Sequence, residues 1–252
     1  MGLSEASSVS DNDPESWHVQ VFRSLDSTSV KEFPKNSKEA SGENLLCGKN
    51  ILVDMSIHTA YVKAIRSAQH FIYIENQYFL GSSFNWDSHN DVGANNLIPM
   101  EIALKIASKI RAREKFAAYI VIPMWPEGDP TSKGMQSILY WQYNTMQMMY
   151  QTIYKALVEA ELDGQYEPQD YLNFFCLGTR EVADGNVNNN AKENPTQYAA
   201  KEVTEMTSHL LKYPVQVDRT GQVTSLPGCE TFPDLGGKII GTFHRIKENL
   251  TI

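Results

Sequence analysis

Long hydrophobic runs, paired cysteines and an excess of basic residues are all missing from this sequence. The longest apolar stretch, FAAYIVIPMW from Phe116, is about half of the ~18 residues that a membrane-spanning helix needs. The formal net charge of −8 disfavours nucleic acid as a partner, because phosphate backbones bind clustered basic surfaces. The N-terminal segment lacks the features of a secretory signal and the three cysteines are widely spaced, which together predict a cytoplasmic location.

Common catalytic and ligand-binding motifs are absent as well. The sequence holds no G-x-G-x-x-G, no P-loop, no G-x-S-x-G and no H-E-x-x-H motif. Its six histidines are scattered without a metal-binding spacing, and each is better explained as a structural or solvated residue. We therefore expect no metal ligand and no bound cofactor in this chain.

Helical and strand patterns alternate from residue 56 onwards. Apolar stripes predict helices over 56–68, 97–110 and 132–162, and short apolar runs predict strands over 71–74, 117–124 and 171–178. Because the strands are apolar on both faces and are separated by helices, we expect parallel pairing with helices covering both faces. The sequence therefore predicts an α/β fold, a mostly parallel sheet flanked by helices.

The two ends of the chain have weaker patterns. Residues 17–24 alternate as a strand does, 25–50 are polar and predict a surface loop, and 182–197 form an Asn-rich linker. After the linker we expect a helix over 198–211 and an irregular tail in which 215–218 and 238–243 are able to pair. The predicted division is a disordered leader (1–16), a partial α/β domain (17–181), the linker (182–197) and a C-terminal segment (198–252).

Polar and aromatic side chains follow the first two predicted strands. Ligands bind beyond the carboxyl ends of parallel strands, so we expect a pocket wall there. Two carboxylates in this set are compatible with an acid–base pair, although a strand-end carboxylate more often holds a loop through backbone N–H groups. The candidate wall residues are Glu75, Asn76, Gln77, Tyr78, Trp125 and Glu127.

A basic stretch stands out in this acidic sequence. It consists of Lys105, Lys109, Arg111 and Arg113. These cations are suited to anionic lipid headgroups. A solvated helix end stabilised by the helix dipole explains the same residues and is the favoured interpretation.

Long stretches of the sequence resemble plant phospholipase D of the β/γ type. The resemblance covers the chain from Trp17 onwards and is carried by IYIENQYFLGSSFNW, NNLIPMEIALKI, YIVIPMWPEG, DYLNFFCLGTRE and SWHVQVFRSLDS. It implies two facing α/β halves that hydrolyse the terminal phosphodiester of glycerophospholipids to phosphatidic acid in lipid degradation. It also implies peripheral binding to a phospholipid membrane, calcium held by a C2 domain, and two H-x-K-x-x-x-x-D motifs that supply a nucleophilic histidine and a general acid.

The sequence departs from this family pattern at its chemical centre. None of the six histidines is followed two residues later by lysine, so both motifs are missing. The C2 domain, and with it the calcium of the family, has no counterpart in the sequence. The chain thus looks like a truncated and internally deleted phospholipase D, and we expect it to have no catalytic residue and no lipase activity alone.

Two classes of function stay open. The first is a phospholipase D by descent, in which Glu75 and Asn76 either order the wall beside the absent histidine or bond within their own loop. The second is a non-catalytic module that binds a G-protein α subunit, an anionic membrane or a full-length phospholipase D. The tripeptide Glu114-Lys115-Phe116 resembles the element through which plant members are thought to contact the G-protein, and is otherwise the start of a strand.

Overall fold

The computed structural model describes residues 14, 19–25, 31–34, 36–45, 54–83, 86, 96–177, 210–232 and 235–244. It divides the chain into two compact units, residues 1–60 and 61–252. The predicted leader (1–16) and linker (182–197) lie outside the described residues except for Pro14. The predicted domain boundaries therefore remain predictions.

The first unit holds little regular structure. Its elements are β1 (Ser24–Leu25), α1 (Ser37–Gly42) and β2 (Asp54–Met55), and β1 pairs antiparallel with β2. The strand predicted over 17–24 is wrong for 19–23, where Val19 and Val21 are 79% and 87% exposed and no partner buries them. The loop predicted over 25–50 contains α1, which begins where the Asn36 side chain accepts a hydrogen bond from the Lys38 N–H at 2.9 Å.

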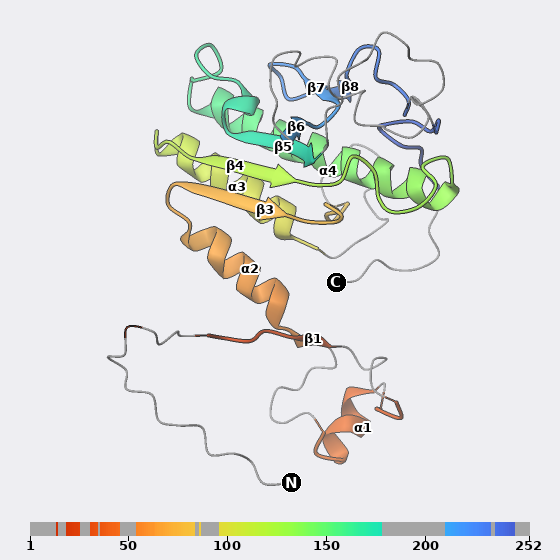
Figure 1. The fold of residues 1–252 in the computed structure, drawn as a ribbon. Helices are drawn as coiled ribbons and strands as arrows, with labels where there is room; N and C mark the ends of the chain where they lie inside the picture. Colours follow the sequence, from red (N-terminus) through yellow and green to blue (C-terminus); the bar gives the residue numbers. More distant parts are fainter. Residues whose placement is uncertain are drawn as a thin grey trace. The chain divides into compact units, whose positions relative to one another are not determined.

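The second unit is built on a four-stranded sheet of order β3-β4-β5-β6 (Figure 1). Its strands are β3 (Phe71–Glu75), β4 (Ala117–Val121), β5 (Leu172–Leu177) and β6 (Leu210–Lys212). The first three are parallel, with Tyr73 level with Tyr119 and Tyr119 level with Asn173, and β6 is antiparallel to β5. This confirms the predicted α/β class and its mostly parallel sheet.

Three helices accompany these strands: α2 (Ser56–Ser67), α3 (Ile98–Arg111) and α4 (Lys133–Glu159). Pro99 lies in the first turn of α3, where a missing N–H costs nothing, and Ile102, Ile106 and Ile110 are fully buried along one side. The Ser132 hydroxyl caps α4 by accepting from the Met135 N–H at 3.3 Å. The predicted helix over 132–162 ends three residues early, because Glu161 has a positive φ of 57°.

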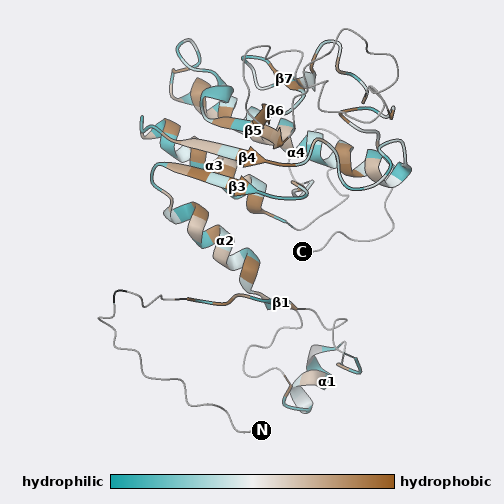
Figure 2. Ribbon diagram, in the orientation of Figure 1, coloured by the Kyte–Doolittle hydropathy of each residue, from teal (hydrophilic) through white to brown (hydrophobic). Residues whose placement is uncertain are grey.

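Helices cover only one face of the β3–β4–β5 sheet among the described residues. Figure 1 and Figure 2 show α3 and α4 on the same side, where they pack on Ile120 and Phe174. The opposite side, called the bare face below, carries nine side chains, two of them polar: Phe71, Tyr73, Glu75, Ala117, Tyr119, Val121, Asn173, Phe175 and Leu177. Both right-handed crossovers step in the same direction, so both helices fall on one face. The described residues do not test the expected cover of the other face, which stays a prediction.

The C-terminal segment packs against α4 through short strands. β7 (Val215–Val217) pairs antiparallel with β8 (Val223–Ser225), and Thr231 forms a single bridge with Lys238. Pairing near 215–218 is confirmed, while the helix predicted over 198–211 is wrong at Leu210 and Leu211, which add to the sheet beside β5. The other residues of that predicted helix, 198–209, lie outside the described residues.

Gly221 allows this close packing. It has a φ of +80°, and a Cβ added there would lie 2.6 Å from the Tyr150 carbonyl oxygen on α4. No residue with a side chain fits such an approach without a backbone shift. Within the described ranges, no helix combines the length and the apolar character needed to cross a bilayer.

The buried side of α4 should carry much of the stability of the second unit. Ile153 is fully buried, so Ile153→Ala should lower the free energy of unfolding by about 2–5 kcal/mol through lost contacts and a residual cavity. Val158 lies on the same helix but is 45% exposed, and Val158→Ala should cost less than about 0.5 kcal/mol. Urea unfolding followed by circular dichroism measures both changes, and equal losses would contradict the packing described here.

Candidate functional site

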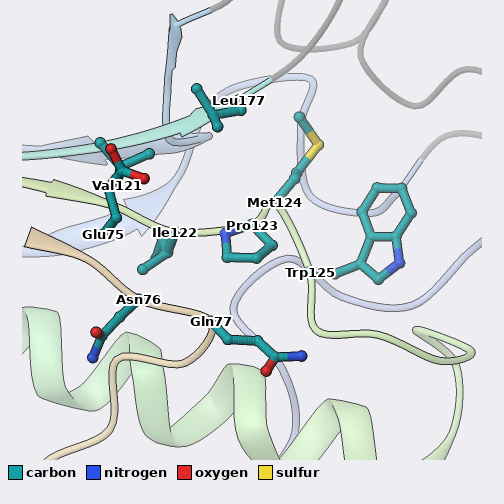
Figure 3. Close-up of a pocket in the computed structure, with 9 residues that line it drawn as sticks. All are labelled: Glu75, Asn76, Gln77, Val121, Ile122, Pro123, Met124, Trp125 and Leu177. Carbon is teal, nitrogen blue, oxygen red and sulfur yellow. The ribbon is translucent and has the colours of Figure 1, made fainter.

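A cleft of about 530 Å³ lies at the carboxyl end of β3, β4 and β5 (Figure 3). The three strand ends are level because their pairing continues to the last residues. The Asn76 N–H donates to the Val121 carbonyl at 3.0 Å, and the Ile122 N–H donates to the Phe175 carbonyl at 2.9 Å. The lining residues are Glu75, Asn76, Gln77, Val121, Ile122, Pro123, Met124, Trp125 and Leu177.

The structure brings four of the six predicted wall residues into this cleft. Glu75, Asn76, Gln77 and Trp125 line it, whereas Tyr78 and Glu127 do not. Glu127 follows the turn after Trp125 and is exposed. The geometry therefore does not place Glu75 and Glu127 in one cleft, as an acid–base pair would need.

Adjacent polar residues at the end of β3 have different surroundings. Figure 3 shows the Glu75 and Asn76 side chains pointing to opposite sides of the strand. The Glu75 carboxylate accepts a hydrogen bond from the Tyr73 hydroxyl, which raises the pKa of Tyr73. The Asn76 amide donates to the Tyr78 carbonyl at 3.3 Å, as the loop-ordering explanation requires. Glu75 is thus tied to a neighbour on its own strand, and Asn76 to its own loop.

A buried hydrogen-bond network holds the backbone next to the cleft in place. The Phe79 N–H donates to the Gln142 Oε1 at 3.2 Å, and the Gln142 Nε2 donates to the Tyr213 hydroxyl at 3.1 Å. That hydroxyl donates to the Met124 carbonyl at 3.2 Å. Burial raises the pKa of Tyr213 well above its usual range, so the phenol keeps its proton. The network thus joins the loops after β3 and β4 to α4 and to the C-terminal segment.

Sequence reasoning did not identify Gln142 or Tyr213. Gln142 is 2% exposed in the middle of α4, and Tyr213 is 3% exposed just after β6. The sequence signal that could have identified Gln142 is its polar side chain within a helix rich in apolar residues. A nearby ring contact adds to the support: Trp125 packs edge to face on Phe232, with ring centroids 5.1 Å apart.

The lining of the cleft is mainly apolar. Among the described residues that line it, none is Lys, Arg or His, and Glu75 is the single ionisable group. The described part of the chain also contains no group of three or more His, Cys, Asp or Glu residues placed to hold a metal ion. The arrangement is suited to enclosing part of a ligand, and it lacks the cations that stabilise a phosphoryl group.

A second cavity, of about 600 Å³, lies at the amino end of the same strands and includes the predicted G-protein element. Glu114, Lys115 and Phe116 all line it. Phe116 is only 4% exposed, and a hydrogen bond from Lys109 to Glu114 lowers the pKa of that carboxyl. Both charged residues of the tripeptide are exposed, and Glu114 is paired with Lys109.

The predicted lipid-binding cations are occupied by contacts within the protein. Lys109 is buried and paired with Glu114, and Arg111 pairs with Glu159 at 2.7 Å. The other two bond to backbone carbonyls, Lys105 to Arg66 at 2.8 Å and Arg113 to Ala160 at 3.3 Å. These contacts favour the explanation as a helix end over a free basic patch.

Removing the hydroxyl group of Tyr213 should destabilise the buried network that holds the Met124 backbone beside the cleft. Tyr213→Phe leaves the Gln142 amide and the Met124 carbonyl without this buried partner, which should lower the free energy of unfolding by about 1–3 kcal/mol. Tyr78→Phe is the matched control, because Tyr78 is 37% exposed and outside the network. Chemical denaturation of both variants measures the difference. Equal stability would show that the network contributes nothing.

Comparison with known proteins adds the family. A model of the phospholipase D family matches residues 2–197 and again 185–241. Phospholipase D gamma 1 of Arabidopsis thaliana is 56% identical over 100% of this chain, and phospholipase D beta 1 is 48% identical over 100%. Phospholipase D alpha 3 of the same plant is 54% identical over 69% of it.

The relatives are much longer than this chain. It spans 43% of phospholipase D gamma 1, 34% of phospholipase D beta 1 and 21% of phospholipase D alpha 3. The gamma 1 alignment runs over 370 positions, which is 118 more than the 252 residues present here. This chain is therefore a β/γ-like fragment of the phospholipase D family.

Proposed function

We propose that this chain keeps one wall of a phospholipase D active site but does not hydrolyse phospholipid by itself. The observation that carries the proposal is the absence of the H-x-K-x-x-x-x-D motif, since no histidine is followed two residues later by lysine. The cation-free lining of the cleft agrees with it. By descent, the reaction concerned is hydrolysis of the terminal phosphodiester of glycerophospholipids to phosphatidic acid.

The missing groups are the ones that the chemistry requires. A nucleophilic histidine divides the reaction into two easier steps through a covalent intermediate, and lysine ammonium groups neutralise the phosphoryl oxygens as charge develops. Enzymatic rate enhancement corresponds to at least ~8 kcal/mol of transition-state stabilisation. Glu75 brings negative charge to the cleft, which opposes binding of a phosphodiester anion.

The residues that remain are assigned to shaping the wall. Asn76 orders the loop after β3, and Trp125 is fixed by its contact with Phe232. Gln77 and Trp125 both face the cleft from different loops (Figure 3). In a longer chain these side chains would lie beside the imidazole and ammonium groups that this one lacks.

A second candidate function is a non-catalytic interaction module. The exposed aromatic residues of the bare face favour it, because a protein seldom leaves such a largely apolar surface uncovered. Partners consistent with the sequence are a G-protein α subunit at Glu114-Lys115-Phe116, a phospholipid membrane surface, and a longer phospholipase D. The internal pairing of Lys109 and Arg111 argues against the membrane partner.

The purified chain should release no headgroup from phospholipid vesicles. The vesicles contain phosphatidylcholine and phosphoinositide, with calcium in the buffer, and headgroup release is measured against a protein-free blank. Arabidopsis phospholipase D gamma 1 serves as the positive control. The expected signal equals the blank, because the sequence lacks the histidine and lysine pairs that attack phosphorus and stabilise its oxygens.

Two sets of variants distinguish residual turnover from contamination. The first is Glu75→Gln, and the second is substitution of each histidine by alanine. Release that any of these abolishes would contradict the proposal. Release that all variants retain comes from a contaminating enzyme and leaves the expected inactivity in place.

A further inference from the structure

The bare face is a surface of the second unit that the proposed active-site wall leaves largely unused. Phe71, Tyr73 and Leu177 on it are 63%, 56% and 61% exposed, and Tyr119 is 40% exposed. Tyr119 stacks on Phe175 with ring centroids 6.5 Å apart, and the polar side chains of Glu75 and Asn173 lie on the same face. Such a largely apolar surface is typical of a buried layer and not of a solvated one.

The two described crossovers, from β3 to β4 and from β4 to β5, do not cover the bare face in the direction they take. The steps β3 to β4 and β4 to β5 run the same way across the sheet, so right-handed crossovers put α3 and α4 on one side. Helices reach the opposite side only through crossovers that step the other way, to strands beyond β3. One unit, a strand beside β3 together with its crossover helix, would therefore both pair with the outer edge of β3 and cover the bare face.

The outer edge of β3 is open for pairing within the described part of the chain, since β3 is the first strand of the sheet order. The Asn76 N–H and the His70 carbonyl bond to β4. Because backbone groups alternate along a strand, Ile72 and Ile74 also face β4, whereas Phe71, Tyr73 and Glu75 present their N–H groups outward. The strand contains no proline, lysine or bulge of the kind that protects natural edges.

The size of the bare face fits one amphipathic helix. Three strands spaced ~4.8 Å apart and five residues long give a surface of roughly 14 by 17 Å. A helix about 10 Å wide that rises ~1.5 Å per residue covers it with ~11 residues. The alignment with phospholipase D gamma 1 holds 118 more positions than this chain, enough for about three strand–helix units of ~30 residues or more each.

A second copy of this chain fits the surface less well. The exposed parts of the aromatic side chains, each of which carries ~150–250 Å², give on the order of 400 Å². A stable dimer buries ~800 Å² on each partner. A strand paired with β3 together with a helix on the bare face supplies the missing contact, because backbone hydrogen bonds add to the apolar burial.

We propose that the outer edge of β3 and the bare face dock, in trans, the segment of a longer phospholipase D that has no counterpart in this chain. The segment contributes a strand beside β3 and an amphipathic helix over Tyr73 and Tyr119. We place it where the two family-model matches meet, at residues 185–197. The proposal rests on the family relationship and not on the absence of hydrolysis, so the two can fail separately.

The test is co-expression of this chain with a tagged segment of Arabidopsis phospholipase D gamma 1. The segment comprises the positions of that protein that align with no residue here. Capture of the tag should recover this chain in a one-to-one complex, and titration of the purified partners gives the dissociation constant. Headgroup release plays no part in this readout.

Variants of the docking surface separate its edge from its face. Tyr73→Pro removes an outward N–H while the β3–β4 hydrogen bonds remain, since prolines are tolerated where an edge N–H faces outward. Tyr73→Ala keeps the backbone N–H but removes the ring together with its hydrogen bond to Glu75, and Tyr119→Ala affects the bare face alone. Each substitution should raise the dissociation constant at least tenfold, and Tyr73→Pro should raise it more than Tyr73→Ala does. Leu104→Ala, on α3 and 48% exposed, is the matched control and should bind as the parent does.

Every outcome decides the proposal. Recovery of the complex and its loss in the surface variants support it. No complex from a parent chain that unfolds cooperatively would overturn it, as would equal binding by all variants. A dimer of this chain in sedimentation velocity without affinity for the segment would overturn it in favour of a second copy. Circular dichroism spectra of the variants show whether lost binding comes from lost folding, and a misfolded variant is replaced by Tyr119→Ser.

Discussion

The second unit depends on one geometric constraint, the handedness of its two crossovers. Because β3, β4 and β5 are parallel and follow one another in a single direction, α3 and α4 lie on the same side of the sheet. The same constraint brings three strand ends together, which creates the cleft beyond Glu75 and Val121. It also leaves the opposite face open. The cleft and the bare face are therefore two consequences of one topology.

The C-terminal segment completes the cleft although it is distant in sequence. Tyr213 bonds to Gln142 and Met124, and Phe232 packs on Trp125, so the loop after β4 is held from two sides. Gly221 permits the approach of the β7–β8 turn to the backbone of α4. A chain that retained the sheet without this segment would lose the fixed position of Trp125. This explains why residues beyond 210 belong to the same compact unit as β3.

Much of the fold was predictable because its signals are local. Ser132 and Pro99 mark helix starts through their own backbone chemistry, and the isoleucine stripe of α3 follows from helical periodicity. Contacts between distant residues were not predictable, because neither Gln142 nor Tyr213 carries information about its partner. Leu210 and Leu211 look helical alone and become a strand because β5 offers an edge. The strands showed that both faces are apolar, but not that a covering layer is present in this chain.

Scaffold and chemistry are separable in this molecule because they depend on different forces. Apolar packing along α3, α4 and the sheet forms from residues that the chain retains, and it needs no charged group. Phosphoryl transfer depends on a nucleophile and on fixed cations, which act only at short distances in a water-poor site. A cleft that keeps its shape while Glu75 is its single charge favours the neutral portion of a ligand over a phosphodiester. The wall of the cleft is therefore held by apolar packing, independently of the charged groups that phosphoryl transfer needs.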